Sequence, residues 1–233
     1  MAINAILFDL DGTLIDTDEA HIRAWREAFL AKGHKVAEDA VRPEIGKGGD
    51  HLVTDLLGAD EERRIGSSLR AAHDDNFRRL ARRSRLKVFV GAVPLLEELK
   101  RHGIKTAIVT SSKKSMVNAT FMSGGIDLGL RVDALITADD AERSKPSPDL
   151  LLATLERLDL SAEACVFVGD TTHDGVAAAR AEVPFVAVTC GGCASPEELT
   201  LAGALSIWTG PNDLRENLNT LLAIEANPQG KKF

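Results

Sequence analysis

The sequence is that of a medium-sized globular protein with an acidic balance. Its 233 residues are 44% hydrophobic and 27% charged, and the formal net charge is −7. An acidic chain is a poor candidate for broad binding to nucleic acid or to anionic membrane surfaces. No apolar run approaches the ~20 residues that cross a bilayer, and aspartates interrupt the first apolar stretch, unlike in a signal peptide. We therefore expect a cytosolic protein.

Strands and helices are predicted to alternate along most of the chain. Apolar runs predict strands at residues 3–8, 105–109, 134–137, 165–168, 185–188 and, with a weaker pattern, 206–208. The helical period predicts helices at residues 94–101, 113–122, 148–158, 174–181 and 213–224. This alternation predicts an α/β fold, with a doubly wound, Rossmann-like parallel sheet covered by helices on both faces.

The connection after the first strand is much longer than the others. Residues 9–104 contain no convincing strand, but the helical period predicts helices at 18–32, 50–57 and 61–83. A structureless loop of this length is implausible in a compact domain. We expect a small α-helical domain at residues 17–87, inserted into a core made of residues 1–16 and 88–233. The linkers should lie near residues 16–18 and 87–91.

Several local patterns have ordinary explanations. Ser147 before Pro148 predicts a helix cap, and Ser195 with Glu198 predicts a capping box. The polar residues 227–233 are expected to be a disordered tail. The arginine-rich stretch 63–85 is typical of a solvated helix face, with a local positive field that attracts anions as the alternative.

Two of the three cysteines, Cys190 and Cys193, form a CxxC pair. No further ligands at zinc spacing accompany them, and the two residues between them are glycines. We expect two free thiols in a loop.

The first predicted strand runs directly into two carboxylates, Asp9 and Asp11, followed by Gly12. Residues i and i+2 of a strand share a side, and glycine allows the sharp turn that follows. Open α/β sheets bind ligands beyond the carboxyl ends of their strands, so this is where a site should lie. Alone, the pattern could also be a pair of turn-forming aspartates.

Three further polar motifs follow later strands. They are Thr110-Ser111-Ser112, Lys145-Pro146 and Gly169-Asp170 with Asp174. Singly, they could be helix caps, a surface lysine and a turn. Four such motifs at successive strand ends indicate one shared site.

These four motifs, in this order, resemble those of the haloacid dehalogenase-like hydrolase superfamily. The resemblance covers residues 5–189, and the helical insert is similar to the family's cap domain. Asp16-Thr17 and His21 with Ala24-Trp25 resemble the branch that holds phosphoglycolate phosphatase and β-phosphoglucomutase. The resemblance implies a phosphoric monoester hydrolase that acts on a small phosphorylated metabolite, such as phosphoglycolate or a sugar phosphate. It leaves the oligomeric state open.

The resemblance also implies roles in catalysis. Asp9 would be the nucleophile that forms an aspartyl-phosphate, and Asp11 the general acid and base. A neighbouring carboxylate should raise the pKa of Asp11 and help it hold a proton. Lys145 would neutralise Asp9 and the phosphoryl group, and Thr110 or Ser111 would donate hydrogen bonds to the phosphoryl oxygens.

The resemblance implies Mg²⁺ as the cofactor, since a carboxylate attacks a phosphate dianion only where cations cancel the repulsion. The metal ligands would be Asp9, the Asp11 backbone carbonyl and Asp170. Asp174 would bind the ion directly or orient the other ligands.

Substrate binding is expected to involve both the core and the insert. Gly12 and Ser111 are the candidates from the core. From the insert, His21 lies just past the linker, and Lys47 lies in a glycine-rich loop. The alternatives are a packing role for His21 and an exposed loop position for Lys47.

Four alternative functions remain. A 2-haloacid dehalogenase would lack a metal-binding aspartate at position 11. A β-phosphoglucomutase would carry an arginine in the loop that here reads Gly46-Lys47-Gly48-Gly49. A phospho-acceptor signalling domain also uses an aspartate, a hydroxyl and a lysine, but needs neither an acid at i+2 nor an insert. A nucleic-acid module would depend on arginines 78–85.

Overall fold

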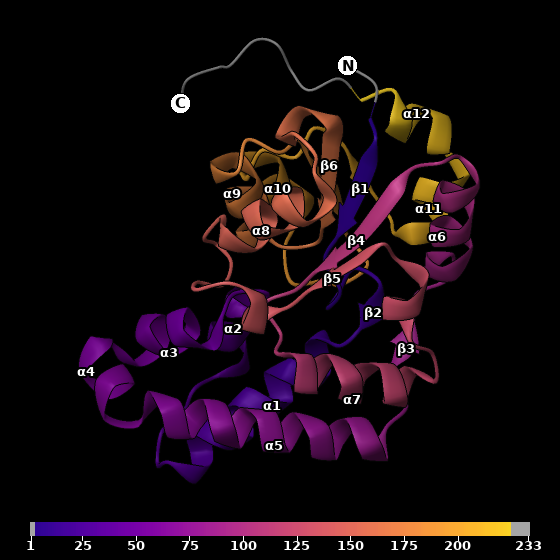
Figure 1. The fold of residues 1–233 in the computed structure, drawn as a ribbon. Coiled ribbons are helices and arrows are strands. Elements are labelled where there is room, and N and C mark those ends of the chain that lie inside the picture. Colours follow the sequence, from indigo (N-terminus) through magenta and orange to yellow (C-terminus); the bar gives the residue numbers. More distant parts are fainter. Residues whose placement is uncertain (1–2, 225–233) are drawn as a thin grey trace.

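The computed structural model describes residues 3–224 and contains a six-stranded, wholly parallel sheet in the order β5-β4-β1-β6-β7-β8. Figure 1 shows this sheet with helices packed around it. The strands are β1 (Ala5–Phe8), β4 (Lys105–Val109), β5 (Ala134–Ile136), β6 (Cys165–Gly169), β7 (Phe185–Val188) and β8 (Ile207–Trp208). The predicted α/β fold class is confirmed.

Helices cover both faces of the sheet because successive strand residues point to opposite sides. On one face Ile6 and Phe8 join an apolar cluster, and on the other Ala5 and Leu7 join a second. The first face is covered by α6 (Ala92–Arg101), α7 (Lys114–Gly124), α11 (Pro211–Glu216) and α12 (Leu218–Leu222). The second is covered by α8 (Asp149–Leu158), α9 (Thr172–Arg180) and α10 (Pro196–Leu201). Short 3₁₀ turns lie at Leu128–Arg131, Ala138–Asp140 and Ala162–Ala164.

The segment between β1 and β4 forms a helical insert with its own apolar cluster. Its elements are α1 (Asp18–Ala31), α2 (Glu38–Val41), a 3₁₀ turn at Arg42–Glu44, α3 (Gly49–Leu57), α4 (Ala59–Glu61), a π turn at Glu62–Gly66 and α5 (Ser67–Arg83). The long helix α5 packs on α1 and also on α7 of the core. In Figure 1 the insert lies below the sheet, on the side where β1 ends.

No strand was predicted between residues 9 and 104, and this is wrong at the two crossings to the insert. The two segments pair as antiparallel strands, β2 (Ile15–Asp16) and β3 (Lys87–Val88). Phe89 N–H also donates to the Leu14 carbonyl at 3.0 Å. Two strands of two residues each show too little alternation to be recognised from sequence, and they form only because both crossings lie side by side.

Three predicted helices differ in detail from the structure. The helix at 61–83 is interrupted by the π turn, and the helix at 213–224 is divided at Asn217, whose side-chain amide donates to the Asp213 carbonyl. Helix α8 begins at Asp149, and the Ser147 hydroxyl donates to the Asp149 carboxylate rather than capping a backbone N–H. The capping box at Ser195 is confirmed.

Two further expectations concern the C-terminal tail and membrane-spanning helices. The tail at residues 227–233 lies outside the described residues. Within residues 3–224, no helix combines the length and apolar character that a bilayer crossing requires.

Candidate active site

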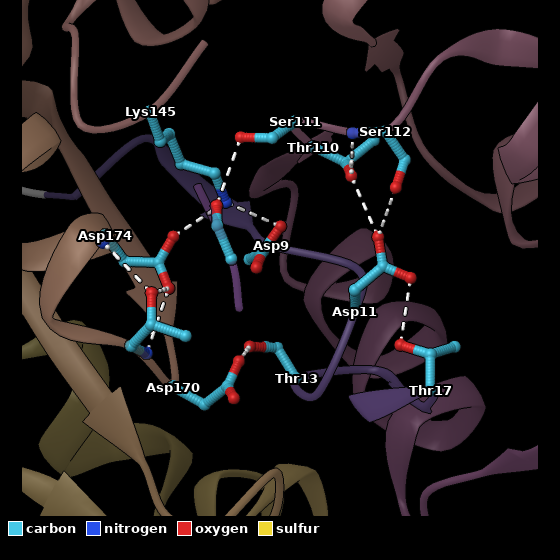
Figure 2. Close-up of polar contacts among 12 residues, drawn as sticks. Asp9, Asp11, Thr13, Thr17, Thr110, Ser111, Ser112, Lys145, Asp170 and Asp174 are labelled. Carbon is cyan, nitrogen blue, oxygen red and sulfur yellow. Dashed lines mark hydrogen bonds and ion pairs between the residues drawn. The ribbon is translucent and has the colours of Figure 1, made fainter. Parts of the chain in front are cut away.

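The four polar motifs come together at the carboxyl ends of β1, β4, β5 and β6. β1 lies at the centre of the sheet, between β4 and β6, and this is the point where the strand order changes direction. A crevice forms at such a point because the connecting helices leave to opposite faces. Figure 2 shows the side chains of Asp9, Lys145, Asp170 and Asp174 grouped there, with Asp11 to one side.

Lys145 is fully buried and joins two of the carboxylates. Its Nζ lies 2.8 Å from Asp9 Oδ1 and 2.7 Å from Asp174 Oδ1. Burial alone would lower the pKa of this lysine, but Asp174 and Asp9 outweigh it and raise the pKa. The two carboxylates therefore favour the charged form of Lys145, and its burial shows that the surface-lysine alternative is wrong.

Asp174 is oriented by the start of its own helix. Its Oδ2 accepts hydrogen bonds from the Thr171 backbone N–H at 3.0 Å and the Thr171 hydroxyl at 2.7 Å, which form a capping box. Since Oδ1 faces Lys145, both oxygens of Asp174 have partners in the protein.

Asp9 and Asp170 are less well satisfied. Asp170 Oδ1 accepts a hydrogen bond from the Thr13 hydroxyl at 2.6 Å, but Asp170 Oδ2 and Asp9 Oδ2 are buried without a hydrogen-bond partner. Burial raises the pKa of both carboxyls well above its usual value, and neighbouring carboxylates raise it further. One oxygen from each of Asp9, Asp170 and Asp174 lies within 4.8 Å of the others. Orphaned carboxylate oxygens in an all-oxygen cluster fit a hard divalent cation such as Mg²⁺.

Asp11 has an opposite environment. Its Oδ1 accepts from the Thr17 hydroxyl at 2.9 Å and lies 3.4 Å from His21 Nε2, while Oδ2 accepts from Thr110 at 3.1 Å and Ser112 at 2.9 Å. Burial raises the pKa of Asp11, but these partners outweigh it and lower the pKa overall. The expectation of a raised pKa was wrong, because three hydroxyl groups, drawn in Figure 2, and His21 face this carboxylate.

A cavity of about 90 Å³ lies between the core and the insert. Asp9, Asp11 and Lys145 line it on the core side. The insert adds both apolar and polar groups: His21, Trp25, Ile45, Gly46, Lys47, Gly49, Leu52, Arg70, His73 and Asp74. The core completes the lining with Thr110, Ser111, Ser112, Lys113 and Met116. The insert therefore forms one wall of the cavity that reaches Asp9.

The loop that bears Lys47 contacts the core closely. Gly48 N–H donates to the Lys145 carbonyl at 3.1 Å, and the Ser111 hydroxyl donates to the Gly46 carbonyl at 3.2 Å. Lys47 itself pairs with Glu44 and, at 2.7 Å, with Asp55. Its side chain is largely buried and its charge is already compensated, so it is not a free loop lysine.

Gly12 and Gly191 are needed for close packing around Asp170. A Cβ on either glycine would overlap Asp170 Oδ2 and come within 2.8 Å of a carboxylate oxygen of Asp18. Gly12 also adopts a left-handed φ of 77°, as the sharp turn after Asp11 requires. Gly12 does not line the cavity, so its place in the structure is that of a turn residue beneath the site.

Sequence reasoning missed several residues of the site. Ser112 was placed in the second motif without a role of its own, and the alternative of a helix cap does not hold, because α7 begins later and has no side-chain cap. Thr13 directly follows Gly12, and Thr17 belongs to the Asp16-Thr17 pair named above, so both could have been noticed. Arg70 belongs to the arginine-rich stretch, in which Arg63, Arg64, Arg70, Arg78 and Arg79 all pair with acidic side chains. These pairs favour a neutralised helix face over a positive field.

The thiols are free, as expected. Cys190 and Cys193 form no disulfide, and burial raises the pKa of each. Cys190 Sγ contacts the Gly12 carbonyl at 3.3 Å, and Cys193 Sγ contacts Asp18 Oδ2 at 3.1 Å.

Comparison with known proteins finds relatives by sequence and by structure. The chain is 30% identical over 190 residues to pyrophosphatase PpaX from Bacillus cereus, covering 81% of this chain and 84% of that protein. It is 28% identical over 223 residues to the chloroplastic protein SUPPRESSOR OF QUENCHING 1 from Arabidopsis thaliana. That match covers 94% of this chain but spans only 20% of the Arabidopsis protein.

The fold is shared with a solved structure of a hydrolase from Pseudomonas syringae. The TM-score is 0.87 at 29% identity, and the match covers 96% of this chain and all of that one. The model of the haloacid dehalogenase-like hydrolase family matches residues 6–188, a range that contains all four motifs. The predicted enzyme class, a phosphoric monoester hydrolase of this superfamily, agrees with the family and with the phosphatase name of the Bacillus relative. The chain belongs to the haloacid dehalogenase-like hydrolase family.

Proposed function

We propose that this hydrolase releases phosphate from small phosphorylated metabolites through an aspartyl-phosphate on Asp9, with Mg²⁺ as its cofactor. The observation that carries the proposal is the Lys145 Nζ held 2.8 Å from Asp9 Oδ1, beside two buried carboxylate oxygens that have no partner in the protein. A buried lysine cancels part of the repulsion between Asp9 and a phosphate dianion. The unpartnered oxygens of Asp9 and Asp170 could bind a cation that cancels the rest.

In this proposal Asp9 attacks phosphorus and the bond to the leaving oxygen breaks. The electron pair of that bond stays on the leaving oxygen, which takes a proton from Asp11. Water then attacks the phosphoryl group on Asp9, gives its proton to Asp11, and frees the Asp9 carboxylate with release of inorganic phosphate. Splitting one displacement into two lets the same aspartate pair serve both steps.

Asp11 must be protonated when the bond between phosphorus and the leaving oxygen breaks. In the resting site its carboxylate is the better stabilised form, since four groups face it. We propose that a substrate in the cavity displaces some of these contacts and that His21, 3.4 Å from Oδ1, is the nearest side chain able to supply the proton.

The Mg²⁺ would be held by the carboxylates of Asp9 and Asp170 and by the Asp11 backbone carbonyl. Asp174 would orient the site without binding the ion, since both its oxygens have protein partners. When bound, the ion would neutralise charge on the phosphoryl oxygens.

The insert, residues 17–87, would act as a cap that excludes water and selects the leaving group. We propose that His21 and Lys47 contact the substrate together with Ser111 and Thr110, whereas Gly12 forms the turn that follows Asp11. Phosphoglycolate and small sugar phosphates remain the substrates to test first, and pyrophosphate joins them because of the name of the Bacillus relative. A cytosolic location also remains a prediction.

The proposal is tested by measuring phosphate release from a panel of metabolites with and without Mg²⁺. Asp9→Asn keeps the shape of the side chain but removes the nucleophile. It should lower kcat by at least about a thousandfold, in line with the loss of a nucleophile in other hydrolases. Asp139→Asn, at an exposed carboxylate outside the cavity, is the control and should keep the parent rate. Equal rates for Asp9→Asn and the parent would refute the mechanism.

The same panel separates the alternatives. A hexose 1-phosphate converted to the 6-phosphate without free phosphate would indicate a mutase. Halide release from a 2-haloacid would indicate a dehalogenase. A phospho-aspartate that persists for hours would indicate a signalling domain.

A further inference from the structure

Asp18 is a buried acid that the proposed mechanism does not use. It is the first residue of α1 and is 1% exposed. Its Oδ2 faces the Cys193 thiol at 3.1 Å, and its Oδ1 has no hydrogen-bond partner. No lysine or arginine among the described residues forms an ion pair with it. A charged group held this way is costly unless something compensates it.

The unpartnered oxygen of Asp18 shares a small space with the unpartnered oxygen of Asp170. A Cβ placed on Gly12 would meet Asp170 Oδ2 and lie 2.8 Å from Asp18 Oδ1. A Cβ placed on Gly191 would meet Asp170 Oδ2 and lie 2.8 Å from Asp18 Oδ2. Two glycines therefore leave open the gap in which a carboxylate of the insert faces a carboxylate of the core.

The simplest alternative is that Asp18 stabilises the start of α1. An acid in the first turn interacts favourably with the helix dipole. Such an acid normally stays solvated or accepts a backbone N–H, whereas α1 has no side-chain cap and Asp18 is buried. The dipole accounts for the residue type, but it does not account for an oxygen that points at Asp170 without a partner.

We propose that Asp18 belongs to the outer shell of the cation site, where its Oδ1 accepts a hydrogen bond from a water of the ion's hydration shell, and so ties the first helix of the insert to the metal. The inference rests on the proposed function, since it takes Asp170 as a metal ligand. Mg²⁺ keeps several of its waters in protein sites, and groups that orient such a shell change metal affinity by about 10- to 100-fold.

The consequence is a coupling between metal binding and the position of the insert. Asp18 follows β2, the strand at which the insert leaves the core. If the ion favours the closed position of α1, closure must favour the ion by the same factor. Metal binding in the core would then change the position of the insert, which forms the other wall of the cavity.

The test is Asp18→Asn, which removes the charge and keeps the shape. We expect Mg²⁺ binding, measured by isothermal titration calorimetry, to weaken about tenfold. We also expect the melting temperature in EDTA to be at least as high as that of the parent, because Asp18 Oδ1 has no hydrogen-bond partner to lose. A residue that only stabilises the helix would instead lower the melting temperature in EDTA and leave the metal affinity unchanged, and this result would overturn the inference.

Asp16→Asn is the matched control. It removes the same charge two residues earlier, from a half-buried position in β2. Its Mg²⁺ affinity should stay within about twofold of the parent. If both variants weaken binding equally, the effect is one of net charge and the inference fails.

A second measurement uses Trp25, a buried residue of α1 that lines the cavity. In a Trp208→Phe background it is the sole tryptophan, and Mg²⁺ should reduce its quenching by acrylamide. Adding Asp18→Asn should abolish that reduction. The Trp208→Phe protein keeps Asp18. If Mg²⁺ leaves the acrylamide quenching of Trp25 unchanged in that protein, the coupling is overturned.

The outcomes also separate the two proposals. A parent protein that binds no Mg²⁺ overturns the proposed cofactor and this inference together. A parent that binds Mg²⁺ and releases phosphate, with Asp18→Asn binding the ion equally well, overturns this inference alone.

Discussion

Ser111 and Ser112 are adjacent residues whose hydroxyls serve different parts of the site. Ser112 Oγ donates to Asp11 Oδ2 at 2.9 Å. The Ser112 backbone N–H donates to Thr110 Oγ1, which holds the residue in this position. Ser111 Oγ donates to the Gly46 carbonyl of the insert at 3.2 Å. The first contact orients the proposed acid and base, and the second joins the core to the loop that covers it.

We predict that Ser112→Ala lowers kcat by about 10- to 100-fold, because Asp11 loses a group that holds its side chain in position for proton transfer. Ser111→Ala should mainly raise KM, because it removes the hydrogen bond to the Gly46 carbonyl of the insert and leaves the contacts of Asp11 unchanged. Steady-state phosphate release for the two variants checks this. A larger loss of kcat in Ser111→Ala than in Ser112→Ala would contradict the assignment.

At the scale of elements, α1 and α5 form the main packing contact of the insert, and they enclose His73. The His73 ring stacks on Trp25 with the centroids 4.2 Å apart, and its Nε2 lies 3.1 Å from His21 Nδ1. Its Nδ1 lies 3.1 Å from Asp74 Oδ1. Burial lowers the pKa of His73 to about 4, more than the nearby Asp74 raises it.

The lowered pKa predicts that part of the folding stability disappears in acid. An unfolded histidine binds a proton near pH 6.5, whereas folded His73 does so only near pH 4. The unfolded state therefore binds more protons between these values, and the free energy of unfolding falls as the pH drops from 6.5 to 4, by up to about 3 kcal/mol.

Urea unfolding at pH 7.5 and pH 4.5 measures this loss. His73→Gln should lose less stability than the parent between the two pH values, although it starts from a lower stability. His102→Gln, at an exposed histidine after α6, should lose as much as the parent. Parallel losses in all three proteins would show that His73 is not the group responsible.

At the scale of the whole molecule, three carboxylates from two strand ends lie together with one lysine to compensate them. One oxygen from each of Asp9, Asp170 and Asp174 lies within 4.8 Å of the others, and Lys145 contacts two of the three. Burial and mutual repulsion disfavour the charged forms of Asp9 and Asp170, so a bound cation, which compensates those charges, should stabilise the folded state as a whole.

We predict that Mg²⁺ at about 100 times its Kd stabilises the protein by about 2.7 kcal/mol, which corresponds to a rise in Tm of roughly 5–10 °C for a chain of this size. Thermal unfolding in Mg²⁺ and in EDTA measures the rise. Asp170→Asn should lose it, whereas Asp60→Asn, at an exposed carboxylate, should keep it. A rise that survives Asp170→Asn would place the ion elsewhere.

Most of the fold could be predicted from the sequence, because the spacing of apolar residues and the residues that begin helices are local properties. The six predicted strands and the helices of the core follow these patterns within a few residues. The pair β2–β3 and the break at Asn217 could not be predicted in this way. The first depends on two distant segments meeting, and the second on a side chain that competes for a backbone carbonyl.

The sequence by itself determined that Asp9, Thr110, Lys145 and Asp170 would gather, because parallel strands end at the same edge of a sheet. Only the tertiary structure decided their surroundings. Asp11 is stabilised as a carboxylate by hydroxyls that lie about 100 residues away, and Asp18 meets Asp170 across a gap that two glycines leave open. Strand ends are set by local pattern, but a carboxylate's charge state depends on every group packed around it, wherever that group lies in the chain.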